Sequence, residues 1–124
     1  MIHLDTSLLI DALTGSKRSG ARLRSLIMEG ERLVLDSIVV FEWRRGPRTK
    51  EEITDQEALF SASDCVPFGP AEALLAADLY RSVKRARGRE IDIAIAACAI
   101  VQGAQLWTLN PQDFRGIPNL KLVP

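Results

Sequence analysis

Short apolar runs alternate along the chain with longer segments whose apolar residues recur every three or four positions. The short runs predict strands and the longer segments predict helices. Five strands are expected, at residues 2–5, 32–36, 64–68, 105–109 and 120–123. Helices are expected at residues 6–15, 19–30, 37–46, 50–63, 70–88 and 91–103. Ser37 is expected to be the N-cap of the third of these helices, because its hydroxyl can accept a hydrogen bond from the first turn.

Strands that alternate with helices are typical of a parallel sheet covered by helices on both faces. Such a sheet collects its functional residues at the carboxyl ends of the strands. At 124 residues, of which 47% are hydrophobic and 26% charged, the chain is expected to form one domain at 1–124. No apolar run approaches the ~18 residues of a membrane span, and no leader pattern begins the chain, so a cytoplasmic location is expected. Cys65 and Cys98 are expected to be packed thiols.

The net charge is zero, but the basic residues are clustered at 17–24, 44–50 and 81–89, and the last of these windows contains no acid. A solvated helix face is the ordinary explanation of such a cluster. Binding of a polyanion is the alternative, because RNA phosphates are held by lysine and arginine. The candidate RNA-binding residues are Arg44, Arg45, Lys84, Arg85, Arg87 and Arg89.

Four acids stand in apolar surroundings at the places where the predicted topology would bring them together. Asp5 ends the first strand, and Asp113 follows the fourth. Glu42 lies in the helix after the second strand, between Phe41 and Trp43. Asp92 opens the apolar helix 91–103. We expect these four carboxylates to meet at the carboxyl edge of the sheet.

Each of these acids except Glu42 also has an ordinary structural explanation. Asp5 could cap the helix that begins one residue later. Asp92 could be favoured by the positive end of a helix dipole, and Asp113 could form a turn after the Asn-Pro pair. Asp11 and Asp36 are interpreted as structural, the first on an outward helix face and the second beside a cap.

Converging carboxylates require either raised pKa values or a bound cation. Two like charges about 5 Å apart repel by roughly 3 kcal/mol at an effective dielectric constant of about 20. Oxygen ligands without histidine or cysteine select a hard ion, Mg²⁺ or Mn²⁺. His3, the only histidine, is expected to be a packed or edge residue, so a Ser-His-Asp site is excluded. Acids, a metal and basic residues together are what metal-assisted hydrolysis of a phosphodiester needs.

An ordered set of motifs resembles one known family. The set comprises D-T-S at residues 5–7, the helix Glu42, D-x-x-I-A-A from Asp92 and T-x-N-x-x-D-F from Thr108, and the closing I-P-N-L-K-L-V completes it. In this order and spacing the chain resembles the PIN-domain nucleases, in particular the VapC-like toxins of bacterial toxin–antitoxin pairs. The likeness covers essentially the whole chain.

The resemblance implies an α/β/α sandwich with a mainly parallel five-stranded sheet, Mg²⁺- or Mn²⁺-dependent endoribonuclease activity, a cognate antitoxin and a homodimer. By position, Asp5, Glu42 and Asp92 match the family's acids, and all four acids would act as catalytic and metal-binding residues. The fourth position of the family is divided here between Asn110 and Asp113.

The same resemblance assigns supporting roles to Thr6, Ser7 and Asn110. Thr6 or Ser7 would hold the Asp5 carboxylate or a water on the metal, and Ser7 stands where the family often has asparagine.

Two other classes of function compete with the nuclease interpretation. A haloacid-dehalogenase-like phosphatase would carry D-x-D at the end of the first strand, and Ser7 stands at the second of those positions. A PIN-fold RNA- or protein-binding module without catalysis is the other possibility, and the complete set of four acids argues against it.

Overall fold

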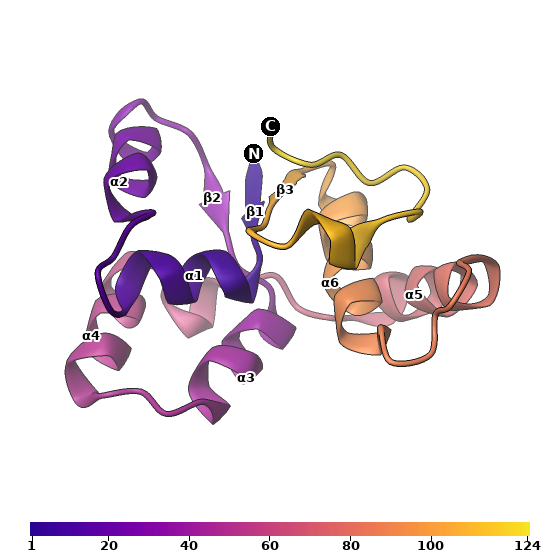
Figure 1. Cartoon of the computed structure of the whole chain (residues 1–124), viewed down its shortest axis with the longest axis horizontal. Coiled ribbons are helices and arrows are strands. Elements are labelled where there is room, and N and C mark those ends of the chain that lie inside the picture. Colours follow the sequence, from indigo (N-terminus) through magenta and orange to yellow (C-terminus); the bar gives the residue numbers. More distant parts are fainter.

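Three parallel strands form the central sheet of the molecule (Figure 1), which is described here for residues 1–124 from a computed structural model. The strands are β1 Ile2–Leu4, β2 Leu33–Val34 and β3 Gln105–Trp107. The α-helices are α1 Thr6–Leu13, α2 Gly20–Met28, α3 Ser37–Arg45, α4 Lys50–Leu59, α5 Pro70–Ser82 and α6 Glu90–Gln102. Two short 3₁₀ helices, η1 Ala62–Asp64 and η2 Pro111–Phe114, complete the chain.

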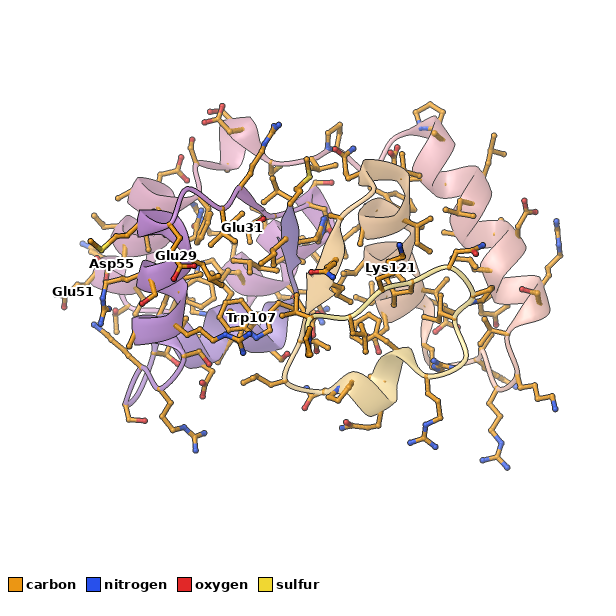
Figure 2. All side chains as sticks on the ribbon, turned by 90° about the horizontal axis from the view of Figure 1, so that it is seen from above. Glu29, Glu31, Glu51, Asp55, Trp107 and Lys121 are labelled. Carbon is orange, nitrogen blue, oxygen red and sulfur yellow. The ribbon has the colours of Figure 1, made fainter.

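The central strand of the sheet is β1, with β2 on one side and β3 on the other. Ile2 is paired in parallel with Leu33 and with Gln105. All three residues of β1 are buried, as a strand covered on both faces should be. The helices α1, α2 and α4 lie on one side of the sheet and α5 and α6 on the other (Figures 1 and 2). The predicted α/β class with a parallel sheet and helices on both sides is therefore confirmed.

The predicted number of five strands is wrong. Residues 64–68 and 120–123 do run along the two edges of the sheet, but each forms one bridge only, Asp36 with Val66 and Leu106 with Leu122. Beside the first segment, the chain leaves the sheet at Ser37 to begin α3, so no strand remains to be paired. Pro67 also lacks the N–H group that a longer ladder would need.

Two predicted helices are longer than the helices that form. The segment 50–63 is helical only to Leu59 and continues, after a break, as η1. The segment 70–88 is helical only to Ser82, and residues 83–89 form a turn into α6. Arg85 and Gly88 adopt left-handed backbone conformations in this turn, with φ of 56° and 87°. The turn therefore carries Lys84, Arg85, Arg87 and Arg89 of the basic cluster, whereas Arg81 remains in the last turn of α5.

A buried hydrogen bond between two side chains links the central strand to the start of α3. His3 Nε2 lies 2.6 Å from Asp36 Oδ2, and both side chains are completely buried. The other oxygen of Asp36 accepts a hydrogen bond from the backbone N–H of Val39 at 2.8 Å. Asp36, and not Ser37, is therefore the N-cap of α3. The prediction that His3 is a packed residue is confirmed, and the interpretation of Asp36 as structural agrees with these contacts.

The helix α6 provides much of the core on the other side of the sheet. Its residues from Ile93 to Ala99 are all buried, and it contacts α5, α3 and β3. Gly103 ends it in a left-handed conformation. Cys98 is buried in this helix and forms no disulfide with Cys65. No helix in the structure is both long enough and apolar enough to cross a membrane.

Replacement of the buried acid should destabilise the fold strongly. In Asp36→Ala, the buried His3 loses its hydrogen-bond partner and α3 loses its cap. We expect the free energy of unfolding to fall by about 2–5 kcal/mol, measured by urea denaturation. The control is Asp78→Ala, whose carboxylate is exposed and pairs with Arg81 at the surface, and which should cost at most about 1 kcal/mol. Equal effects of the two substitutions would contradict this role of the buried pair.

Candidate active site

Asp5 lies at the carboxyl end of β1 and is only 5% exposed. Its backbone N–H donates to the carbonyl of Trp107, which continues the pairing of β1 and β3 by one step. Its Oδ2 accepts hydrogen bonds from Ser7 Oγ at 2.8 Å and from Thr108 Oγ1 at 2.6 Å. Although Asp5 occupies the N-cap position of α1, its side chain accepts no hydrogen bond from the helix backbone. Helix capping therefore does not explain this carboxylate.

Thr108 is a site residue that the sequence did not single out. It follows β3 directly, so its hydroxyl lies at the same edge of the sheet as Asp5. It also lies 3.2 Å from Ser7 Oγ and accepts a hydrogen bond from the backbone N–H of Asn110. Asn110 therefore contributes through its backbone, and its side-chain amide makes no contact with the acids. The rule that located Asp5, that strand ends meet at one edge, would also have located Thr108.

Glu42 is held by two side chains that come from different helices. Thr6, at the start of α1, donates its hydroxyl hydrogen bond to Glu42 Oε1 at 2.6 Å. Arg45, one turn further along α3, lies 3.4 Å from Glu42 Oε2. Ser7 holds Asp5, as expected, whereas Thr6 holds a different acid of the set. The half-buried Glu42 carboxylate is thus kept at the edge of α3 that lies next to α1.

Asp92 is the acid whose pKa is affected by the charges of the other three acids. It lies half-buried in the first turn of α6 and accepts no hydrogen bond from the protein. Burial raises the pKa of the Asp92 carboxyl to about 6, and three neighbouring carboxylates act in the same direction, in decreasing order those of Asp5, Asp113 and Glu42. The positive charge of Arg89 acts against this rise. The acids predicted from separate parts of the sequence thus lie within electrostatic reach of one another.

Asp113 reaches the site on η2, an element that the sequence did not predict. Its side chain is exposed and accepts no hydrogen bond. Arg89 fastens η2 to the neighbouring turn, because Nη2 donates to the carbonyls of Asp113 at 3.0 Å and Arg115 at 2.8 Å, and Nη1 to that of Lys84 at 3.3 Å. Arg89, expected to contact RNA, therefore also keeps the backbone of Asp113 beside α6.

The other basic candidates divide into two groups. Arg44 donates to Gln56 and pairs with Glu57, and Arg45 pairs with Glu42. By contrast, three exposed cations form no ion pair: Lys84, Arg85 and Arg87. Only the second group has its charge free for a ligand.

The donor chemistry of the acids fits a hard divalent cation. No three His, Cys, Asp or Glu side chains converge as a ready-made metal site. Mg²⁺, however, is commonly bound by one or two carboxylates, with water and phosphate oxygens as the remaining ligands. Asp5 Oδ1 accepts no hydrogen bond from the protein, and neither does the carboxylate of Asp92. A cation bound at these oxygens would also relieve the repulsion that raises the pKa of Asp92.

Comparisons with known proteins place the chain among relatives of the same length. The family model of the PIN domain matches residues 2–119. Ribonuclease VapC19 of Mycobacterium tuberculosis is 34% identical over 121 residues, which cover 95% of this chain and 95% of that protein.

Solved structures share the fold of this chain over nearly its whole length. VapBC2 from Rickettsia felis, solved bound to a DNA fragment from their promoter, has a TM-score of 0.79 at 23% identity, covering 99% of this chain and 98% of that one. FitAcB from Neisseria gonorrhoeae has a TM-score of 0.74 at 26% identity, covering 100% of this chain and 97% of that one.

The raised pKa of Asp92 predicts a pH-dependent stability of the metal-free protein. Because the folded state binds this proton more tightly than the unfolded state, the free energy of unfolding should fall as the pH rises from about 4 to about 6. Asp92→Asn should therefore stabilise the protein near pH 7.5, on the order of 1–2 kcal/mol after allowance for solvent screening, and much less near pH 4.5. Urea denaturation in EDTA at the two pH values measures this difference. The exposed Asp64→Asn is the control, and an equal gain at both pH values would contradict the electrostatic cause.

Proposed function

The chain belongs to the PIN-domain family, and from this membership and its acidic site we propose that it is an Mg²⁺- or Mn²⁺-dependent endoribonuclease. It hydrolyses phosphodiester bonds within RNA and acts as the toxin of a toxin–antitoxin pair. The observation that carries the proposal is that Asp92 lies half-buried without a hydrogen bond, close enough to Asp5, Asp113 and Glu42 for their charges to add to the rise that burial causes in its pKa. Repulsion between these carboxylates does not stabilise the fold, whereas a cation bound among them would stabilise their ionised forms.

Each acid has a role that follows from its contacts. Asp5 and Asp92, with uncommitted oxygens, would hold the ion directly, and Glu42 and Asp113 would hold it directly or through water. Such an ion lowers the pKa of a water molecule and stabilises the negative charge that develops on the phosphate. Ser7 and Thr108 hold the Asp5 carboxylate in one orientation through their hydroxyls. Because the Asp5 carboxylate is held in this way, it need not reorient during the reaction.

The proposal also covers the binding partners of the protein and its location in the cell. The relative from Mycobacterium tuberculosis is named a ribonuclease, and its VapC name agrees with the motifs that suggested a toxin. We therefore expect an RNA substrate, a cognate antitoxin protein, a homodimer and a cytoplasmic location, with residues 1–124 acting as one domain. Leu74 on α5 and Phe41 on α3 are 71% and 55% exposed, and protein partners would cover such apolar side chains.

A PIN-fold binding module without catalysis is the second candidate function. One observation favours it, namely that the acids do not converge as a three-ligand site. Such a module would bind RNA or protein through the same surface but would leave phosphodiester bonds intact. Incubation with RNA separates the two candidates.

Cleavage of RNA should depend on the metal and on the central acids. With mixed RNA and Mn²⁺, we expect cleavage by the native protein, none in EDTA, and a loss of about 100-fold or more in Asp5→Asn or Asp92→Asn, the scale of removing one electrostatic group from an active site. Gel electrophoresis of the RNA over time gives the rates. The exposed Asp78→Asn should cleave at the native rate.

Two results of this experiment would contradict the proposal. Equal cleavage by the native protein and by Asp5→Asn would place the site elsewhere. Binding of RNA without cleavage, in every metal tested, would favour the binding module.

A further inference from the structure

A basic groove opens beside the acidic site, between the turn that joins α5 to α6 and the segment around η2. It encloses about 600 Å³, which lies within the range of about 300–1,000 Å³ that is common for ligand sites. We call it the basic groove. Its polar lining residues include Lys84, Arg85, Arg89, Gln112 and Arg115.

The positive charge of the basic groove is not balanced by the protein. Lys84, Arg85 and Arg115 are exposed and take part in none of the ion pairs of the chain. The guanidinium group of Arg89 donates hydrogen bonds to backbone carbonyls, which hold it in place without cancelling its charge. No acid lines the groove, and Val83 is its only hydrophobic residue. These features suit an anion, and no aromatic side chain lines the groove on which a base could stack.

The basic groove and the acidic site both draw residues from the start of α6 and from η2. Arg89 comes three residues before Asp92, so the two stand about one helical turn apart at the start of α6. Gln112 precedes Asp113 in η2, and Arg115 follows the end of η2 directly. Figure 2 shows nitrogen-tipped side chains extending from η2 and from the end of α5 on the same side of the molecule. An anion in the groove would therefore lie next to the substrate of the acids.

We propose that the basic groove binds a backbone phosphate of the RNA strand adjacent to the phosphate that is cleaved. This inference rests on the proposed ribonuclease function and adds a binding site to it. Lys84, Arg85 and Arg115 supply the charge, Gln112 supplies an amide donor, and Arg89 keeps the two walls of the groove together. Because the groove is lined by cationic and amide side chains and by no aromatic ring, it holds the strand by its phosphates without reading the identity of its bases.

Binding of a labelled RNA tests the proposal without any cleavage. The full-length protein is titrated into a fluorescein-labelled mixed-sequence single-stranded RNA in EDTA, and anisotropy gives the Kd at several salt concentrations. Arg115→Gln and Lys84→Gln should each weaken binding about 3- to 10-fold and reduce the salt slope by about 0.7, the value for one phosphate contact on a single strand. Arg115→Lys should keep most of the affinity. A single-stranded DNA of the same sequence should show the same proportional losses.

The matched control is Arg24→Gln. Arg24 is also exposed and unpaired, but it lies on α2, at the opposite end of the molecule from the α5–α6 turn (Figure 1). It should leave the Kd and the salt slope unchanged.

Each other outcome overturns a defined part of the argument. Equal losses of RNA affinity in Arg24→Gln and Arg115→Gln would mean that the overall charge of the protein, and not the basic groove, determines binding. Losses confined to RNA would assign the contact to the ribose hydroxyl instead of the phosphate. Native affinity in both Arg115→Gln and Lys84→Gln would overturn the basic groove and leave the ribonuclease proposal intact. A native protein that neither binds nor cuts RNA would overturn both.

Discussion

The parallel pairing of β1 with both of its neighbours determines where the polar groups of the site lie. Parallel strands bring their carboxyl ends to one edge, and β1 is central, so the residue after it is flanked on both sides. Asp5 meets Thr108 there because Leu4 and Trp107 are partners in the register. The buried pair of His3 and Asp36 then fixes the start of α3 against the same strand. A shift of one residue in this register would turn Asp5 away from its hydroxyl partners.

The four acids are not equivalent, because the protein treats each carboxylate differently. Asp5 accepts two hydroxyl hydrogen bonds, Glu42 accepts one and pairs with an arginine, and Asp113 is exposed to water. Asp92 has no hydrogen bond or ion pair and is half-buried, so burial, and after it the charges of the other three acids, raise its pKa. Ionised Asp92 therefore costs the fold free energy at neutral pH. A bound cation would recover it without any change in the surrounding packing.

The sequence predicted the positions that depend on local pattern and missed those that depend on distant contacts. Asp5 and Asp92 were found because one ends an apolar strand and the other opens an apolar helix. The count of strands failed because single bridges at the edges of a sheet look like strands in sequence. Thr108 could have been located from its place after a strand, but its hydrogen bond to Asp5 needed the register of β1 against β3, and the role of Arg89 needed the position of η2. Neither is encoded in the neighbouring residues.

The contact between Thr108 and Asp5 joins residues that are 103 positions apart in the chain. During synthesis β1 emerges before its partner β3, and residues 5–104 lie between the two strands. Pairing across such a distance is slow, since a long loop must be closed before the contact stabilises anything. A nascent or truncated chain therefore carries Asp5 without the edge that orients it. For an enzyme that cuts RNA, this order of synthesis leaves Asp5 without its hydroxyl partner Thr108 until the segment that contains β3 has been made.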